Sequence, residues 1–276
     1  MAQVTQLIHH YLRHNKKFPH VYCPGCGHGI ILGSLIRSVH SLQLPKDDVV
    51  LVAGIGCSGR MAVYVDFNTV HTTHGRALTF ATGIKMANPK LKVIVVMGDG
   101  DALSIGGNHL IHAARRNIGL TALILNNNIY GMTGGQSSPT SPEGTRSATA
   151  PFGQLEKSFD VVSLARSAGA NFVARSTVMH VKLMDRLITT ALTRPGFNLV
   201  ELMTPCHTQY GRKNGFKTNV DMYKWYKKHA TPLERYEKMT PEEREERIPI
   251  GVFRERTCQG LEERYEAMRQ NLREGR

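Results

Sequence analysis

Short apolar runs alternate with amphipathic stretches over the first 206 residues of the chain. The apolar runs are typical of strands buried on both faces, and they cover residues 48–53, 92–97, 120–125, 171–174 and 198–203. The amphipathic stretches predict helices over residues 30–42, 76–86, 104–116, 161–168 and 178–193. This alternation predicts an α/β fold, with a mostly parallel sheet covered by helices on both faces. Ligands of such sheets bind at the carboxyl ends of the strands.

The pattern changes after Cys206, where no further strand-like run is visible. Thr240 followed by Pro241 and two glutamates is typical of a helix start, with Thr as the cap and Glu reaching back to it. Residues 259–273 predict a charged surface helix. We therefore divide the chain into a cofactor-binding domain, 1–217, and a partly helical C-terminal extension, 218–276, which we expect to contact another subunit.

Composition narrows the class of protein. The chain has 276 residues, of which 41% are hydrophobic, and this is ample for a buried core. No run of about 18 apolar residues predicts a membrane-spanning helix. Residues 1–5 lack the basic and then apolar pattern of a secretory signal, so we expect a cytoplasmic protein.

The chain is basic, with 35 Lys and Arg against 22 Asp and Glu, a formal charge of +13. The excess is spread along the chain and forms no basic–aromatic repeat, so we do not expect a nucleic-acid partner. A solvated basic surface explains the charge. The alternative is an acidic protein partner, such as a small electron carrier or a second subunit.

Five cysteines in a chain without a signal argue against a disulfide framework. Cys23 and Cys26 form a C-x-x-C pair, Cys57 follows the first predicted strand and Cys206 follows the last. Four thiolates that converge at one end of a sheet suit Zn²⁺ or a [4Fe–4S] cluster, and their spacing does not choose between the two. Cys258 lies outside this arrangement and is expected to be a plain reduced cysteine.

A second group of polar residues follows two neighbouring strands. Asp99 ends the strand before it, and Asn127 follows the next strand along the chain. A βαβ unit brings such strand ends together, and a carboxylate beside an amide oxygen suits Mg²⁺. Gly100 and the start of the following helix offer backbone N–H groups to a diphosphate.

Several motifs resemble a known family. Gly98 to Gly100 with the Asn126–Asn127 pair resembles the thiamine-diphosphate motif of decarboxylases, transketolases and 2-oxoacid oxidoreductases. Over residues 18–215, five motifs in one order resemble the β subunit of 2-oxoacid:ferredoxin oxidoreductases. They are Cys-Pro-Gly-Cys-Gly-His-Gly (23–29), Gly-Ile-Gly-Cys-Ser-Gly (54–59), His-Gly-Arg-Ala (74–77), Gly-Asp-Gly-Asp (98–101) and Tyr-Gly-Met-Thr-Gly-Gly-Gln (130–136).

The resemblance implies specific site residues. It implies that Mg²⁺ is held by Asp99, Asn127 and the carbonyl of Ile129. It implies a [4Fe–4S] cluster on Cys23, Cys26, Cys57 and Cys206. The residues implied to contact thiamine diphosphate are Ile55, Gly56, Cys57, Ser58, His74, Gly75, Arg76, Ala77, Gly100, Asp101, Gly131 and Met132. We name Arg60, His74 and Arg76 as candidate catalytic residues.

The resemblance also implies an activity, the oxidative decarboxylation of a 2-oxoacid with coenzyme A to an acyl-CoA and CO₂. Electrons would pass through the cluster to ferredoxin. Residues 130–136 resemble the 2-oxoglutarate type, whose product is succinyl-CoA, and Arg60 is either a ligand for the distal carboxylate or a solvated surface side chain. The alternatives are pyruvate or branched 2-oxoacids, a non-redox thiamine lyase, and a zinc-binding scaffold subunit.

The expected protein is incomplete by itself. Thiamine enzymes use a glutamate to relay a proton through the aminopyrimidine ring, and no residue of this chain matches that role. In the resembling family the glutamate lies on a partner α subunit. We therefore expect an αβ or (αβ)₂ assembly and an inactive isolated chain.

Overall fold

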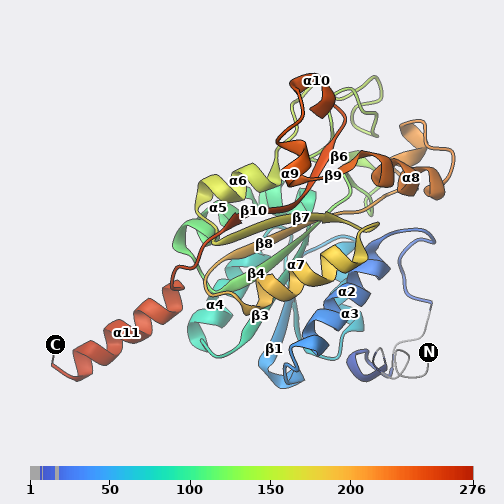
Figure 1. Ribbon diagram of the computed structural model, residues 1–276. Coiled ribbons are helices and arrows are strands. Elements are labelled where there is room, and N and C mark those ends of the chain that lie inside the picture. The colour runs from blue at the N-terminus through green and yellow to red at the C-terminus, as the bar shows by residue number, and fades with distance from the viewer. Residues whose placement is uncertain (1–6, 8, 16–18, 276) are drawn as a thin grey trace.

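The computed structural model describes residues 7, 9–15 and 19–275. Within them an eight-stranded sheet runs through the centre in the order β2-β1-β3-β4-β8-β7-β10-β9 (Figure 1). Its first six strands are parallel to one another. They are β2 (Asn68–His71), β1 (Val49–Ala53), β3 (Lys92–Gly98), β4 (Leu120–Asn126), β8 (Asn198–Met203) and β7 (Phe172–Thr177). The predicted α/β fold is confirmed.

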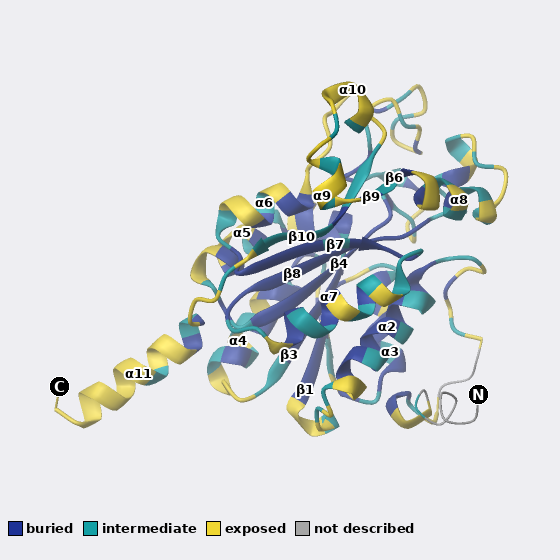
Figure 2. Cartoon of the chain, viewed as in Figure 1, coloured by how far each residue is buried: buried dark blue, intermediate teal, exposed yellow. Residues whose placement is uncertain are grey.

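Helices cover both faces of the sheet, which explains why its central strands are apolar at successive positions. In β1, Leu51 packs into the core under α2 (His28–Ser41) and α7 (Val181–Thr193). Its neighbour Val52 packs into the opposite core, under α4 (Ala77–Ala87), α5 (Gly107–Arg116) and α6 (Val161–Ala168). Figure 2 shows these strands as the buried centre of the molecule.

The smaller elements lie around this frame. Short 3₁₀ turns occupy Lys46–Asp48, Ser58–Arg60 and Gly211–Lys213, and α3 (Met61–Tyr64) leads toward β2. After β4, a two-stranded hairpin is formed by β5 (Ile129–Tyr130) and β6 (Gln136–Ser137). The helix predicted from residue 104 begins differently, because a π-helical turn over Asp101–Ile105 precedes α5. Such turns are frequent at functional sites.

The prediction that no strand follows Cys206 is wrong. β10 (Ile248–Glu255) pairs antiparallel with β7, and β9 (Ala230–Pro232) pairs parallel with β10. β10 contains a proline, a glycine and two charged residues, and its pairing with β7 carries an irregularity after Val252, so it lacks the continuous apolar run of a central strand. β2 is missing from the prediction for a similar reason, since this edge strand is exposed or half-buried along its length.

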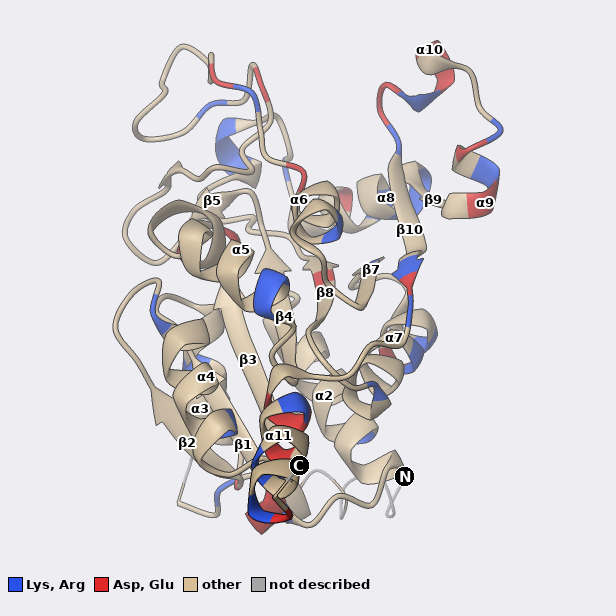
Figure 3. Cartoon of the chain, turned by 90° about the vertical axis from the view of Figure 1, so that its left-hand side faces the viewer, with Lys and Arg blue, Asp and Glu red and all other residues tan. Residues whose placement is uncertain are grey.

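The C-terminal residues also form the helices α8 (Asn219–His229), α9 (Leu233–Tyr236), α10 (Pro241–Arg244) and α11 (Leu261–Arg273). The predicted helix start is confirmed, because the hydroxyl of Thr240 and the side chain of Glu243 form a capping box. The predicted charged helix is α11, which points away from the sheet and carries both signs of charge (Figures 1 and 3). Within the part of the chain that the structure describes, we find no helix long and apolar enough to cross a bilayer.

Candidate active site

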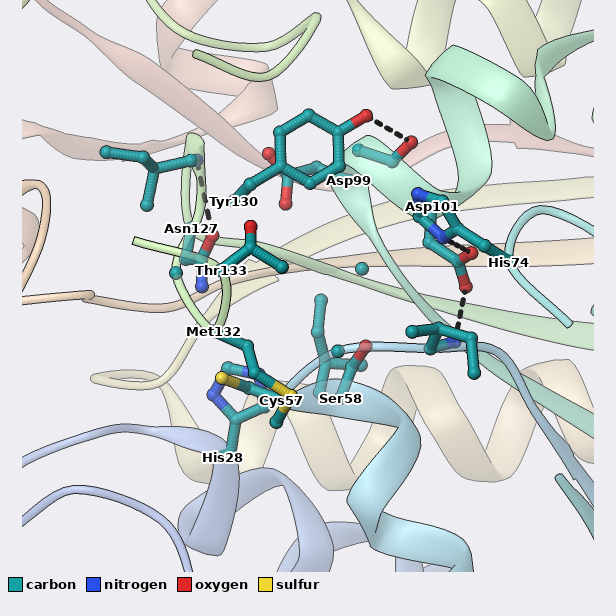
Figure 4. A pocket seen from close by; sticks show the side chains of 17 residues that line it. His28, Cys57, Ser58, His74, Asp99, Asp101, Asn127, Tyr130, Met132 and Thr133 are labelled. Atoms are coloured by element: carbon teal, nitrogen blue, oxygen red, sulfur yellow. Dashed lines mark hydrogen bonds and ion pairs between the residues drawn. The ribbon is translucent and has the colours of Figure 1, made fainter. Parts of the chain in front are cut away.

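The carboxyl ends of four adjacent parallel strands carry the segments singled out by the sequence. β1 leads into Gly54–Cys57, β3 into Asp99, β4 into Asn127 and β8 into Cys206. These segments surround a cleft of about 660 Å³ (Figure 4). Its lining includes twelve residues expected to bind thiamine diphosphate or Mg²⁺: Ile55, Gly56, Cys57, Ser58, His74, Asp99, Gly100, Asp101, Asn127, Ile129, Gly131 and Met132.

Four of the residues expected to act in catalysis or to contact thiamine diphosphate do not line this cleft. Arg60 is exposed at the end of the 3₁₀ turn after Cys57. Arg76 precedes α4 and donates from Nη1 to the carbonyl of Ile105 at 3.3 Å. Ala77 is fully buried in the core, and Gly75 uses its N–H to hold a carboxylate below the cleft. Gly75, Arg76 and Ala77 follow His74 in sequence, but only His74 lines the cleft.

Asp99 is a buried carboxylate, only 2% exposed. Its Oδ2 accepts hydrogen bonds from Ser138 Oγ and Thr140 Oγ1, both at 2.6 Å. Burial raises the pKa of Asp99, while these hydroxyls act in the opposite direction. A divalent cation in the cleft would offset the remaining cost of ionising this carboxylate, so the donor set fits Mg²⁺. The sequence analysis missed Ser138 and Thr140, because isolated hydroxyl residues in a long loop carry no distinctive pattern.

The two neighbouring asparagines have different environments. Asn126 Nδ2 donates to the buried carboxylate of Glu201 at 2.7 Å, and its Oδ1 accepts from Thr140. Asn127 instead lines the cleft, and the backbone then turns at Asn128, which has a φ of 60°. Asp99 and Asn127 therefore face one cavity, as the βαβ argument expected. Asn126 and Glu201 lie behind them and orient the turn.

Asp101 connects three loops under the cleft. Its Oδ1 accepts from His74 Nδ1 at 2.5 Å and from Gly75 N at 2.6 Å, and its Oδ2 accepts from Ile55 N at 3.2 Å. Both carboxylate oxygens are thus used by protein groups. The geometry gives Asp101 a positioning role under His74 and Ile55, although it was expected to contact the cofactor. His74 keeps 39% of its side chain exposed and lines the cleft.

Tyr130 packs across Gly100. Its hydroxyl donates to the Gly100 carbonyl at 3.0 Å, and its ring occupies the space that a Cβ on Gly100 would need. The ring edge also approaches His74, with 6.0 Å between ring centroids. The glycine at position 100 is therefore required by close packing with an aromatic side chain, in addition to leaving its N–H near the cleft.

A second cavity of about 810 Å³, here called the Cys cavity, adjoins the cleft. Cys23, Cys26, Cys57 and Cys206 all line it, whereas the exposed Cys258 does not. The residues that line both cavities are His28, Cys57, Asn127, Gly131 and Met132. The four predicted ligands are therefore gathered, and the Cys cavity shares a wall with the cleft.

The surroundings of the Cys cavity fit a cationic sulfur-binding centre. Burial raises the pKa of Cys26 to about 12 and that of Cys57 to about 11, with the neighbouring cysteines adding to the rise. Thiolates crowded in this way need a metal ion or cluster to ionise at neutral pH. Across residues 7, 9–15 and 19–275, no three His, Cys, Asp or Glu side chains are already closed into a metal-binding group.

Comparisons with known proteins agree with this geometry. Residues 40–202 match the family described as thiamine pyrophosphate enzyme, C-terminal TPP binding domain. The 2-oxoglutarate synthase subunit KorB of Methanothermobacter marburgensis is 48% identical over 243 residues, which are 88% of this chain and 85% of that protein. KorB of Archaeoglobus fulgidus is 46% identical over 265 residues, 96% and 95% of the two chains.

The chain belongs to the β-subunit family of thiamine-dependent 2-oxoacid:ferredoxin oxidoreductases. The 2-oxoacid:ferredoxin oxidoreductase subunit beta of Saccharolobus solfataricus is 39% identical over 246 residues, covering 84% of this chain and 80% of that one. A solved 2-oxoglutarate:ferredoxin oxidoreductase from Magnetococcus marinus, with 2-oxoglutarate, coenzyme A and succinyl-CoA bound, superposes with a TM-score of 0.84. Its identity is 31%, and the match covers 96% of this chain and 90% of that one.

Membership in this family confirms the resemblance seen in the sequence. It also confirms that the chain is part of a thiamine-dependent enzyme, which rules out a zinc scaffold without thiamine. The relatives are subunits of 2-oxoacid oxidoreductases, which argues against a non-redox thiamine lyase.

Proposed function

We propose that this chain is the β subunit of a 2-oxoglutarate:ferredoxin oxidoreductase. The enzyme would convert 2-oxoglutarate and coenzyme A to succinyl-CoA and CO₂ and pass two electrons, one at a time, to ferredoxin. One observation carries the redox part of this proposal. The Cys cavity, with its four cysteines, shares a wall with the cleft that holds Asp99 and Asn127.

The residues of the cleft suit magnesium thiamine diphosphate. Asp99, Asn127 and the Ile129 carbonyl would hold the metal, and the backbone around Gly100 would face the diphosphate. When bound, the cofactor supplies a sink for the electron pair that remains when CO₂ departs. The chain's own groups would orient it, and Asp101 holds His74 and the Ile55 loop in place at the edge of the cleft.

Cys57 supports direct electron transfer, because it lines both cavities and lies between Gly56 and Ser58 of the cleft. One short loop would therefore set the distance between the thiamine site and a [4Fe–4S] cluster on Cys23, Cys26, Cys57 and Cys206. The positive φ of 88° at Gly56 makes the turn that brings Cys57 to this shared wall.

The choice of 2-oxoglutarate is supported by the relatives and by the solved structure, whose names carry this substrate. Arg60 stays our candidate for binding the distal carboxylate; it is exposed at the end of the turn after Cys57 and does not line the cleft. Relative turnover of 2-oxoglutarate, pyruvate and 2-oxoisovalerate by the assembled enzyme tests this choice. Preference for pyruvate would contradict it.

An α subunit is the expected partner, in an αβ or (αβ)₂ assembly. Two apolar side chains of the loop after β6 support a protein partner, since Phe152 is 98% and Leu155 91% exposed. The relatives are also named as subunits of a larger enzyme.

The deciding experiment is the visible spectrum and the iron and sulfide content of the anaerobically purified αβ complex. We expect a broad absorbance that bleaches with dithionite, and we expect Cys57→Ala to abolish ferredoxin or viologen reduction. Cys258→Ala is the matched control and should leave both unchanged. Zinc without iron, or full viologen reduction by the Cys57→Ala complex, would contradict the proposed function.

A further inference from the structure

Two buried residues that carry hydrogen-bond donors, Tyr22 and His28, line the Cys cavity. Tyr22 is 6% exposed, and its hydroxyl is buried without a hydrogen-bond partner in the described part of the structure. His28 is 1% exposed, and its Nδ1 lies 2.9 Å from Cys26 Sγ. Both residues line the Cys cavity, and their rings lie 5.3 Å apart.

The fold holds both side chains firmly. Tyr22 directly precedes Cys23, and its ring packs 6.0 Å from that of Tyr64, whose hydroxyl accepts from Val21 N at 2.6 Å. His28 begins α2 and lines the cleft as well as the Cys cavity (Figure 4). The loop that carries the first two cysteines therefore also carries the two donors.

A buried hydroxyl without an acceptor is costly, so Tyr22 implies an acceptor that the isolated chain does not provide. The four cysteine sulfurs line the same cavity, and sulfur that carries negative charge accepts hydrogen bonds. The short contact between His28 and Cys26 already has this chemistry. His28 thus already contacts a cysteine sulfur, and Tyr22, which lines the same cavity, has a hydroxyl with no acceptor in the described part of the chain.

We propose that Tyr22 and His28 donate hydrogen bonds to sulfur atoms of the iron–sulfur site and thereby raise its reduction potential. This inference rests on the [4Fe–4S] cluster of the proposed function. Reduction adds one negative charge to the cluster, and hydrogen bonds to its sulfurs stabilise that charge. A [4Fe–4S] cluster held by the four cysteines would carry one electron at a time, so the two residues would tune a one-electron couple.

The test is a redox titration of the cluster in the anaerobic αβ complex, followed by electron paramagnetic resonance. Tyr22→Phe removes only the hydroxyl, and His28→Leu removes the imidazole donor. At a fixed solution potential we expect each change to lower the ratio of reduced to oxidised cluster about tenfold, or about 59 mV for one electron. His28→Asn, which keeps an N–H near the position of Nδ1, should recover most of this shift.

Tyr11→Phe is the matched control, because this hydroxyl contacts His40 and Tyr11 lines neither cavity. Its potential should equal that of the unsubstituted complex. An unchanged potential in Tyr22→Phe and His28→Leu complexes that retain iron and sulfide would overturn the inference. So would an equal shift in the Tyr11→Phe complex.

A second measurement does not depend on the stability of the variants. Electron–nuclear spectroscopy of the reduced, unsubstituted complex before and after transfer to D₂O should reveal exchangeable protons coupled to the cluster. The absence of such protons would also overturn the inference. Failure of the proposed function is recognised separately, because the unsubstituted complex would then contain no iron and labile sulfide at all.

Discussion

At the scale of single residues, the geometry of the cleft depends on side chains that hydrogen-bond to the segments lining it. Asp101 accepts three hydrogen bonds, from His74, Gly75 and Ile55, and so fixes the ends of two loops relative to β3. The turn that carries Asn127 is held in a similar way, because the neighbouring Asn126 side chain donates to Glu201 and accepts from Thr140. Errors of about 1 Å at such a site are expected to cost about 100-fold in rate.

Asp101→Asn should therefore lower kcat/KM of the assembled enzyme by about 100-fold. An amide has only one acceptor oxygen, so its NH₂ group must face one of the three donors. Affinity for thiamine diphosphate, measured by calorimetry, should fall as well. Asp66→Asn is the control, since Asp66 forms a half-buried ion pair with Lys46 away from the cleft. Equal activity of the Asp101→Asn and Asp66→Asn enzymes would refute the positioning role.

A second residue-scale prediction concerns Gly100. A Cβ at this position would overlap the Tyr130 ring, so Gly100→Ala should destabilise the fold by about 1–3 kcal/mol and displace Tyr130 toward the cleft. Gly83 lies within α4 with no atom near its Cβ position, and Gly83→Ala should stabilise the chain by up to about 1 kcal/mol. Thermal unfolding compares the two, and a similar Tm for both variants would contradict the packing argument.

At the scale of elements, the C-terminal residues complete the sheet. β10 pairs with β7, which would otherwise present unpaired N–H and C=O groups at an edge. Ile250 of β10 is buried, and Arg175 of β7 stacks on the ring of Phe253. The segment that the sequence analysis set apart as an extension is thus part of the central sheet.

Deleting residues 218–276 should accordingly expose the β7 edge and yield an aggregating chain without a cooperative unfolding transition. Truncation after Arg264 is the control, because beyond Glu262 the residues of α11 are exposed or half-buried. This shorter deletion should change Tm by only a few degrees, by the usual effect of about 1 kcal/mol or less at exposed sites. A soluble, cooperatively unfolding 1–217 chain would show that the extension is dispensable for the fold.

At the scale of the whole molecule, two cavities with different chemistry meet at one rim of one sheet. Asp99 and Asn127 line the cleft and four cysteines line the Cys cavity, with Cys57 in the wall between them. This arrangement is expected when a carbon-centred oxidation must hand single electrons to a neighbouring carrier. In the described part of the chain no glutamate lines the cleft, so we expect the proton-relaying glutamate to come from the partner subunit.

We therefore expect the purified β chain to show no turnover of 2-oxoglutarate with viologen as acceptor. Adding the α subunit should restore activity in proportion to complex formation, followed by light scattering and steady-state rates. Magnesium thiamine diphosphate should bind to the complex more tightly than to either chain alone. Sustained turnover by the β chain alone would contradict this division of labour.

The sequence by itself determined the parallel core and most of the site. Strands buried on both faces, such as β1 and β4, are apolar throughout, and their carboxyl ends must meet, so Asp99 and Asn127 were placed together correctly. The gathering of the four cysteines was expected from the family resemblance and from the same topology. The sequence reveals these features because a strand buried on both faces needs consecutive apolar residues, and the residues just after it must lie at its carboxyl end.

Only the tertiary structure decided which side chains support the site. Ser138, Thr140 and Glu201 are brought to it by loops and strands distant in sequence, and no local pattern marks them. Arg76 and Ala77 do not line the cleft although they lie close to His74 in sequence, and β10 enters the sheet although it looks like a loop. Such features depend on contacts between distant segments, so their physical cause appears only when the chain is folded.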